Sequence, residues 1–238
     1  MSMRKKPVKV SRNADKKAQR KQELQDKEKA TLQPVDITWR TANQKQAWGT
    51  LQKNDITFLL GSAGTGKTFL AMAYAINEIL TKRRSNIILT RPIVDAGEKL
   101  GFLPGSFGEK VNPYMQPLYD TMDTLLGKYN SKREFVNKAI VLAPLCYMRG
   151  RTFNDAVCIF DEAQNATYMQ LKLLLSRFGQ NTKMVVTGDL HQSDLPFSPP
   201  PLKEVVEKLR GTDNIDVIQF SHADVVRHPI VAAILKKL

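Results

Sequence analysis

The chain has 238 residues, of which 42% are hydrophobic, so it is long and apolar enough for one main packed domain. Its 36 lysines and arginines against 23 aspartates and glutamates give a formal net charge of +13. This excess favours a polyanionic partner, with nucleic acid ahead of a membrane surface, because no basic amphipathic segment with large apolar residues is evident. No apolar run reaches membrane-spanning length, and no apolar segment follows the basic N-terminus, so we expect no membrane partner and a cytoplasmic location.

The first 35 residues are more polar and more densely charged than the rest. Met1–Ala30 contains 11 basic and 4 acidic residues, and Asn13–Thr31 has a helix-forming composition with almost no apolar stripe. Such a segment is either disordered or a solvated helix, and its charge serves either solvation alone or a basic binding arm. We therefore divide the chain into a leader, residues 1–35, and a globular domain, residues 36–238.

Within the globular part, short apolar runs alternate with helical patterns. Strands are expected at Ile56–Leu60, Asn86–Thr90, Ile140–Ala143, Val157–Phe160, Met184–Thr187 and Val217–Phe220. Helices are expected at Thr41–Leu51, Phe69–Leu80, Val111–Leu126, Tyr168–Phe178, Leu202–Leu209 and Val225–Leu238. Glycines and prolines interrupt residues 96–107 too often for an ordinary helix. The alternation is typical of an α/β protein with a mainly parallel sheet flanked by helices.

A glycine-rich segment joins the first expected strand to the helix that follows it. Gly61–Thr68 fits the pattern G-x-x-x-x-G-K-T, and it lies between an apolar strand and an apolar helix, as that pattern requires. A glycine-rich turn that matches by chance is the alternative, and the flanking strand and helix make it the weaker one. The segment therefore predicts a site for a nucleoside triphosphate.

Each residue type in this segment has a physical task. Glycines permit positive φ, so the backbone can curl around an anion with successive N–H groups pointing inward, and the helix N-terminus adds a partial positive charge. Lys67 supplies a cation for the β- and γ-phosphates, and the Thr68 hydroxyl is placed to bind Mg²⁺. The residues expected to hold the nucleotide are Gly61, Ser62, Ala63, Gly64, Thr65, Gly66, Lys67 and Thr68.

Two adjacent acids, Asp161 and Glu162, follow the strand expected at Val157–Phe160. In an open α/β sheet, ligands bind at the carboxyl ends of the strands. Asp161 is then placed to hold Mg²⁺, directly or through water, and Glu162 to orient and deprotonate an attacking water. The alternative is that the two acids only cap the next helix, and the phosphate loop in the same chain favours the catalytic interpretation.

Polar residues at two further positions point to the same site. Asp189 and Gln192 follow the strand expected at Met184–Thr187, where they are placed to sense the γ-phosphate. Gln44 lies just upstream of the phosphate loop, and a side-chain amide suits the adenine edge because it both donates and accepts hydrogen bonds. Taken alone, a glutamine at a helix start is a weak indication.

Two sets of motifs resemble known families. Asp161-Glu162-Ala163-Gln164 and Thr187-Gly188-Asp189-x-x-Gln192 resemble motifs II and III of superfamily 1 helicases, which have a RecA-like core. The stretches at 90–105, 143–152 and 224–229, which include Thr90-Arg91-Pro92, Arg149-Gly150-Arg151 and Arg227-His228-Pro229, resemble the PhoH family of phosphate-starvation-inducible ATPases. The resemblance runs from about residue 41 to residue 231, which is most of the globular part.

The resemblance implies a function and a role for each matching residue. It implies a RecA-like P-loop ATPase that uses ATP and Mg²⁺ and acts on single-stranded RNA, with helicase-type activity. Gln44 would contact adenine, Gln192 would link the γ-phosphate to the nucleic acid, and Arg227 would contact the γ-phosphate in cis or in trans. Arg91, Arg149 and Arg151 fall where such helicases touch the polymer backbone, although the last two would equally suit a neighbouring subunit's ATP.

The chain departs from the helicases in one respect, because it contains only the first of their two RecA-like halves. Neighbouring subunits in a ring would supply the missing face, so the resemblance implies a homo-hexamer. Two other functions stay open at this point: a P-loop kinase for a small molecule, and a nucleotide-switched RNA-binding scaffold. Glu162 directly after Asp161, together with Gln192, favours water over an organic acceptor as the nucleophile.

Overall fold

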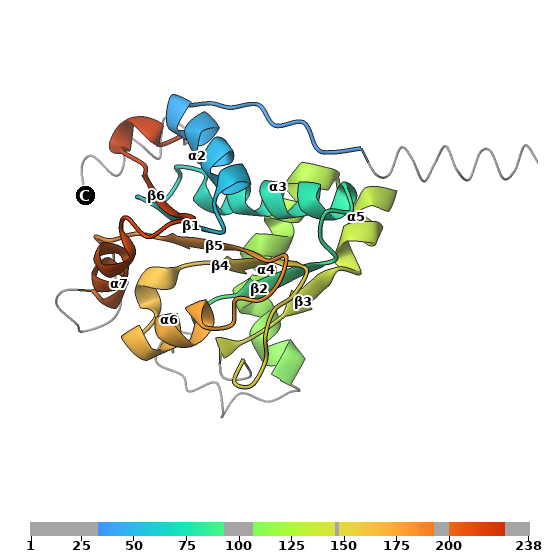
Figure 1. The fold of residues 1–238 in the computed structure, drawn as a ribbon. Helices are drawn as coiled ribbons and strands as arrows, with labels where there is room; N and C mark the ends of the chain where they lie inside the picture. The colour runs from blue at the N-terminus through green and yellow to red at the C-terminus, as the bar shows by residue number, and fades with distance from the viewer. Residues whose placement is uncertain (1–32, 93–106, 146–147, 193–199, 227–238) are drawn as a thin grey trace, which may run out of the picture.

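The computed structural model describes residues 33–92, 107–145, 148–192 and 200–226. Six parallel strands form a single sheet in the order β3-β2-β4-β5-β1-β6 (Figure 1). The strands are β1 Ile56–Leu60, β2 Asn86–Thr90, β3 Ile140–Leu142, β4 Ala156–Phe160, β5 Lys183–Gly188 and β6 Ile215–Gln219. The α/β class and the parallel sheet expected from the sequence are therefore confirmed.

Helices cover both faces of the sheet. The α-helices are α2 Ala42–Lys53, α3 Lys67–Leu80, α4 Phe107–Leu126, α5 Ser131–Asn137, α6 Tyr168–Leu175 and α7 Pro201–Leu209, with short 3-10 turns at η3 Ala163–Asn165 and η4 His222–Asp224. Helices α2 to α5 pack on one face, and α6 and α7 on the other. Each layer buries its own apolar cluster because successive residues of a strand point to opposite faces.

Strand β4 lies near the middle of the sheet, and all five of its residues are buried. Val157 and Ile159 belong to the core under α2 to α5, whereas Cys158 and Phe160 belong to the core under α6 and α7. This near-continuous apolar run is typical of a parallel strand with helices on both faces. The apolar run ends at Phe160, and the next two residues are acids at the carboxyl edge of the sheet.

Several predicted boundaries were wrong. The helix after the phosphate loop begins at Lys67 rather than Phe69, and α4 begins at Phe107 rather than Val111. Helix α6 ends at Leu175, three residues early, and α5 was not predicted at all. The expected closing helix does not begin at Val225, whose backbone is extended. Its residues from 227 onward lie outside the described part, as do residues 1–32 of the leader and residues 93–106.

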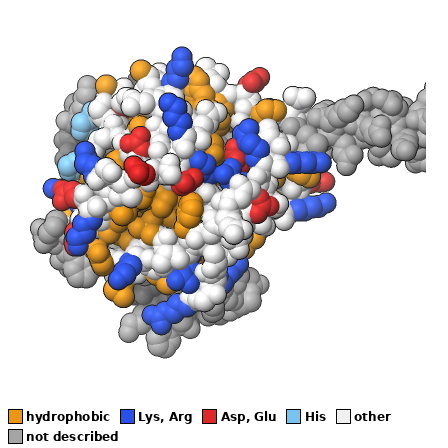
Figure 2. Space-filling model, viewed as in Figure 1, with side chains coloured by type: hydrophobic (Ala, Val, Ile, Leu, Met, Phe, Trp, Pro, Cys, Tyr) orange, Lys and Arg blue, Asp and Glu red, His pale blue; other side chains and the backbone are white. Residues whose placement is uncertain are grey.

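The surface is mixed in charge on the face shown in Figure 2. Lysine and arginine side chains lie scattered among acidic and uncharged ones there, and apolar side chains gather near the centre of the view. In the described part of the chain, no helix combines the length and the apolar character that crossing a bilayer requires. The basic side chains that this face shows are thus scattered rather than concentrated in one stripe.

Candidate functional site: a phosphate loop facing two acids

The loop between β1 and α3 has the backbone conformation that its glycines permit. Gly61, Gly64 and Gly66 have φ of 148°, 88° and 86°, values that residues other than glycine rarely adopt. At Gly61 space is limiting as well, because a Cβ atom would lie 2.8 Å from Cβ of Phe220. The Thr65 hydroxyl donates to the Ser62 carbonyl at 3.0 Å and closes the turn. The loop therefore ends directly in the N-terminus of a 14-residue helix, a favourable place for an anion.

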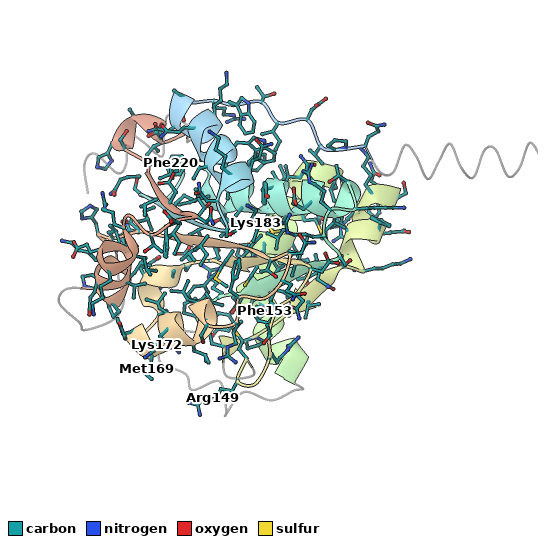
Figure 3. All side chains as sticks on the ribbon, in the orientation of Figure 1. Arg149, Phe153, Met169, Lys172, Lys183 and Phe220 are labelled. Carbon is teal, nitrogen blue, oxygen red and sulfur yellow. The ribbon has the colours of Figure 1, made fainter. Side chains whose placement is uncertain are left out.

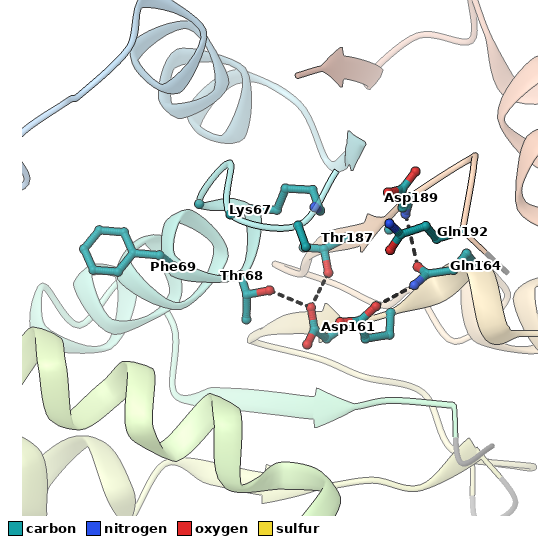
Figure 4. Close-up of a pocket in the computed structure, with 13 residues that line it drawn as sticks. Lys67, Thr68, Phe69, Asp161, Gln164, Thr187, Asp189 and Gln192 are labelled. Carbon is teal, nitrogen blue, oxygen red and sulfur yellow. Dashed lines mark hydrogen bonds between the residues drawn. The ribbon is translucent and has the colours of Figure 1, made fainter. Parts of the chain in front are cut away.

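Lys67 is the first residue of that helix, and its side chain folds back over the loop. Its Nζ donates to the carbonyl oxygens of Gly61 at 2.6 Å and Ser62 at 2.9 Å. Figure 4 shows the ammonium group directed toward the side of the cavity where Asp189 and Gln192 lie. The cation is thus held above the loop, at the position where the phosphates of a bound triphosphate would meet it.

Asp161 lies opposite the start of α3, at the carboxyl end of β4, and is only 3% exposed. Its Oδ1 accepts hydrogen bonds from the Thr68 hydroxyl at 2.8 Å and the Thr187 hydroxyl at 2.5 Å (Figure 4). A hydroxyl and a carboxylate in contact at the rim of a phosphate loop are the oxygen ligands that Mg²⁺ prefers. The predicted pair Thr68 and Asp161 is thus brought together in a form that fits the ion.

A cavity of ≈ 280 Å³ separates the loop from the acids. Its walls come from the loop, the start of α3 and the carboxyl ends of β4 and β5, which the parallel sheet places at one edge (Figure 4). The predicted residues that line it are Ala63, Gly64, Gly66, Lys67, Thr68, Asp161, Glu162, Asp189 and Gln192. Residues scattered over 130 positions of sequence therefore meet in one hollow of nucleotide-phosphate size.

Glu162 is held on both sides. Its backbone has φ 55° and ψ 42°, a left-handed conformation that is strained for a residue with a Cβ. Arg91 Nη2 lies 3.1 Å from Oε1, and the Gln164 amide donates to Oε2 at 2.5 Å. Gln164 in turn accepts from the backbone N–H of Asp189 at 3.1 Å. The base candidate is therefore connected to both neighbouring strand ends, β2 and β5.

Thr187 and Gln164 were not among the predicted site residues, yet both organise the acids. Each lies inside a motif quoted from the sequence, so the motif was the available indication of their importance. Sequence spacing alone does not reveal that Thr187 donates to Asp161 or that Gln164 bridges Glu162 and Asp189, because these contacts require strands β4 and β5 to be neighbours.

Gln44 is 7% exposed and lies against the phosphate loop. Its amide nitrogen donates to the Thr65 carbonyl at 3.1 Å, and its amide oxygen accepts from the backbone N–H of Arg40 at 2.9 Å. These two bonds fix the start of α2 to the loop. The contact of Gln44 with adenine stays a prediction, since in this structure the amide groups are used within the protein.

The predicted nucleic-acid residues occupy two separate places. Arg91 lies beside Glu162, whereas Arg149 and Arg151 are exposed and do not line the cavity. Figure 3 places Arg149 at the same end of the molecule as Lys172 of α6, and the Arg151 guanidinium lies 5.8 Å from the ring centroid of Phe153. Their contact with RNA stays a prediction.

Arg227 lies outside the described residues. The residue before it, Val226, donates its backbone N–H to the Gly64 carbonyl at 2.9 Å, so the chain leaves the described part directly beside the phosphate loop. Asp224 fixes this approach by accepting from Asn43 of α2 at 2.7 Å and from the Ser221 backbone at 2.8 Å. Burial raises the pKa of Asp224, but the hydrogen bonds from Ser221, Asn43 and Thr41 outweigh it and leave the pKa lowered.

The family model and the curated relatives that match this chain indicate the same family. The family model of PhoH-like proteins matches residues 36–238. A PhoH-like protein of Bacillus subtilis is 46% identical over 201 residues, which cover 84% of this chain and 63% of the relative. Protein PhoH of Escherichia coli K12 is 40% identical over 182 residues, which cover 74% of this chain and 51% of the relative. The chain thus spans about half to two thirds of the length of these relatives.

Among solved structures, the Pif1 helicase of Candida albicans matches with a TM-score of 0.36 and 16% identity, over 77% of this chain and 40% of the helicase. A second Pif1 structure, described as showing DNA unwinding at forked duplex DNA, matches with a TM-score of 0.35 and 18% identity, over 85% of this chain and 48% of the helicase.

Proposed function

The chain belongs to the PhoH-like protein family, and on that premise we propose that it hydrolyses ATP with Mg²⁺ and couples hydrolysis to the binding or remodelling of single-stranded RNA. The observation that carries the ATPase proposal is the meeting of Lys67, Thr68, Asp161 and Glu162 around one cavity at the carboxyl edge of the sheet. A cation, two oxygen ligands for a divalent ion and a base are what phosphoryl transfer to water requires.

The position of each residue in the site indicates its proposed role. The loop amides and Lys67 would bind the β- and γ-phosphates, and Thr68 and Asp161 would hold Mg²⁺. When bound, the ion neutralises charge on the phosphates. Glu162 would orient a water molecule in line with the γ-phosphate and take its proton, and Gln192, at the same wall of the cavity, would respond to the γ-phosphate.

The RNA part of the proposal is supported by charge. The chain carries a formal net charge of +13, and Arg149 and Arg151 are exposed, away from the cavity. Contacts of this kind bind a phosphate backbone without reading its sequence, and the binding weakens steeply with salt. A homo-hexamer is part of the same proposal, since a neighbouring subunit would complete the nucleotide site and the strand-binding face.

The test is phosphate release from ATP with and without a 20-nucleotide oligo(U), at one stated low salt concentration. Glu162→Gln keeps the shape of the side chain and is expected to lower turnover by about 10²- to 10⁴-fold with ATP binding retained. Lys67→Ala is expected to lose tight ATP binding, and Lys203→Ala, an exposed lysine of α7, is the matched control with wild-type activity. Unaltered hydrolysis in Glu162→Gln would refute the catalytic assignment.

Two further measurements separate the alternatives. Light scattering with ATP present tests the ring, and a monomer there contradicts the hexamer. Release of free phosphate by water, rather than transfer to an added small-molecule acceptor, separates an ATPase from a kinase. Turnover that oligo(U) does not change would leave a nucleotide-switched scaffold as the better description.

A further inference from the structure

Arg91 lies where the water-activating carboxylate meets the surface. It directly follows β2, which pairs with β4, so it lies beside the acid that follows β4. One end of its guanidinium lies 3.1 Å from Glu162 Oε1, and the other end donates to the Tyr114 carbonyl of α4 at 3.3 Å. The Arg91 side chain is 22% exposed and that of Glu162 39% exposed. The ion pair is therefore both fixed to the fold and reachable from solvent.

Both oxygens of Glu162 are occupied in this arrangement. Oε1 pairs with Arg91, and Oε2 accepts from the Gln164 amide at 2.5 Å. The amide oxygen of Gln164 accepts from Asp189, which prevents the amide from turning round. Each oxygen can still accept a second hydrogen bond, so the two partners set the direction of the carboxylate. Of the two, the ion pair with Arg91 is the one open to competition from solvent.

We propose that Arg91 is a positioning residue that holds Glu162 out of its catalytic position until a phosphodiester of single-stranded nucleic acid takes the guanidinium away. A phosphodiester offers two non-bridging oxygens that a guanidinium can bind in the bidentate manner in which it binds a carboxylate, so it can replace Glu162 as the partner of Arg91. An ion pair this exposed contributes little, so a polyanion that is held by other basic residues can displace it. The hydrolytic site would thereby respond to the strand. The proposal rests on the proposed ATPase function and adds its regulation.

The experiment compares steady-state phosphate release by the wild type, Arg91→Ala and Arg91→Lys, each with no nucleic acid, with oligo(U) and with oligo(dT). For Arg91→Ala we expect kcat without nucleic acid to rise by about two- to fivefold, with KM for ATP little changed, since an exposed ion pair contributes at most about 1 kcal/mol, which corresponds to a factor of about five. We expect either oligonucleotide to add little further stimulation. Arg91→Lys keeps the charge and is expected to restore a low basal rate and part of the stimulation.

Three controls connect the effect to Glu162. The double variant Arg91→Ala/Glu162→Gln must lose the raised turnover, because the released carboxylate is what acts. Lys203→Ala must keep the wild-type basal rate and stimulation. Circular dichroism and thermal unfolding check that each variant is folded, and Arg91→Gln replaces Arg91→Ala if the alanine variant unfolds.

The outcomes distinguish this proposal from the proposed function. Suppose that nucleic acid stimulates ATP hydrolysis by the wild type, and that Arg91→Ala has the same low basal rate and the same stimulation. This result refutes the proposed hold of Arg91 on Glu162, and the proposed ATPase function stands. A basal kcat that falls in Arg91→Ala also refutes that hold, because Arg91 would then hold Glu162 in its productive position. Equal rates of phosphate release by the wild type and by Lys67→Ala would instead refute the proposed function. Stimulation by just one of the two oligonucleotides supports the proposed role of Arg91, and it identifies whether RNA or DNA releases Glu162.

Discussion

Replacing Glu162 by glycine or alanine separates the free-energy cost of its left-handed backbone conformation from the chemistry of its side chain. The residue has φ 55° and ψ 42°, where a Cβ atom crowds the following carbonyl oxygen. Both replacements remove the carboxylate and its ion pair with Arg91, and only alanine keeps the crowded Cβ. The difference in stability between the two variants therefore measures the backbone strain, less the extra freedom of glycine in the unfolded chain.

The magnitude follows from two opposing terms. Left-handed backbone costs a residue with a Cβ about 1–2 kcal/mol, and glycine gives back roughly 0.5–1 kcal/mol through its greater freedom in the unfolded chain. Glu162→Gly should therefore be more stable than Glu162→Ala by about 0.5–1 kcal/mol, which corresponds to a Tm higher by about 1–4 °C in a chain of this size. Both variants should hydrolyse ATP about 10²- to 10⁴-fold more slowly than the wild type.

Urea unfolding and calorimetry of the two variants provide the measurement. The same pair of substitutions at Lys203, an exposed position within helix α7, is the matched control, and there alanine should be more stable than glycine by about 1 kcal/mol. An alanine variant at 162 that exceeds the glycine variant in stability by about 0.5–1 kcal/mol, as at an unstrained position, would show that the backbone is not strained. Wild-type turnover in either variant would show that Glu162 is not the base.

Three other substitutions test separate features of the fold. Gly61→Ala places a Cβ 2.8 Å from that of Phe220 at φ 148°, so we expect a loss of about 1–3 kcal/mol in urea unfolding and weaker binding of a fluorescent ATP analogue. Gly49→Ala, in helix α2 with nothing within 4 Å of the new Cβ, should raise the free energy of unfolding by about 0.5–1 kcal/mol and leave phosphate release unchanged. Burial raises the pKa of the Cys158 thiol from 9.0 to about 12, so the unfolded thiol ionises first and the free energy of unfolding should fall as pH rises from 9 toward 12. Cys158→Ala should reduce that slope without abolishing it, because burial, together with Glu78, also raises the pKa of Tyr74 to about 12.

The sequence predicted the phosphate loop and the acid pair because both follow from local chemistry. Only glycines tolerate the φ values found at Gly61, Gly64 and Gly66, so their spacing encodes the turn. The apolar run of β4 ends in Asp161 and Glu162, and parallel topology places that end beside the loop. In this region a one-dimensional pattern was sufficient to indicate a three-dimensional site.

Other features depend on information that spacing does not contain. Helix α5 buries only Val136 among its seven residues, so it lacks an apolar stripe, and its indication in the sequence was the capping residue Asn130. The Arg91–Glu162 pair joins residues 71 positions apart and exists because β2 is the neighbour of β4. Strand order is set by how the helices pack over the sheet, which an alternation of strands and helices does not specify.

The two adjacent acids are held in physically different ways, and this difference determines which of them can be regulated. Asp161 is almost fully buried and accepts two hydroxyl hydrogen bonds, so moving it would leave both hydroxyls without their partner, at a cost of about 1–3 kcal/mol for each group. Glu162 is 39% exposed, and its ion pair contributes about 1 kcal/mol or less, so a change of partner at Arg91 is enough to move it. The proposed metal ligand is therefore fixed and the proposed base is movable, which would make the base the position through which a bound strand controls hydrolysis without disturbing the phosphate loop.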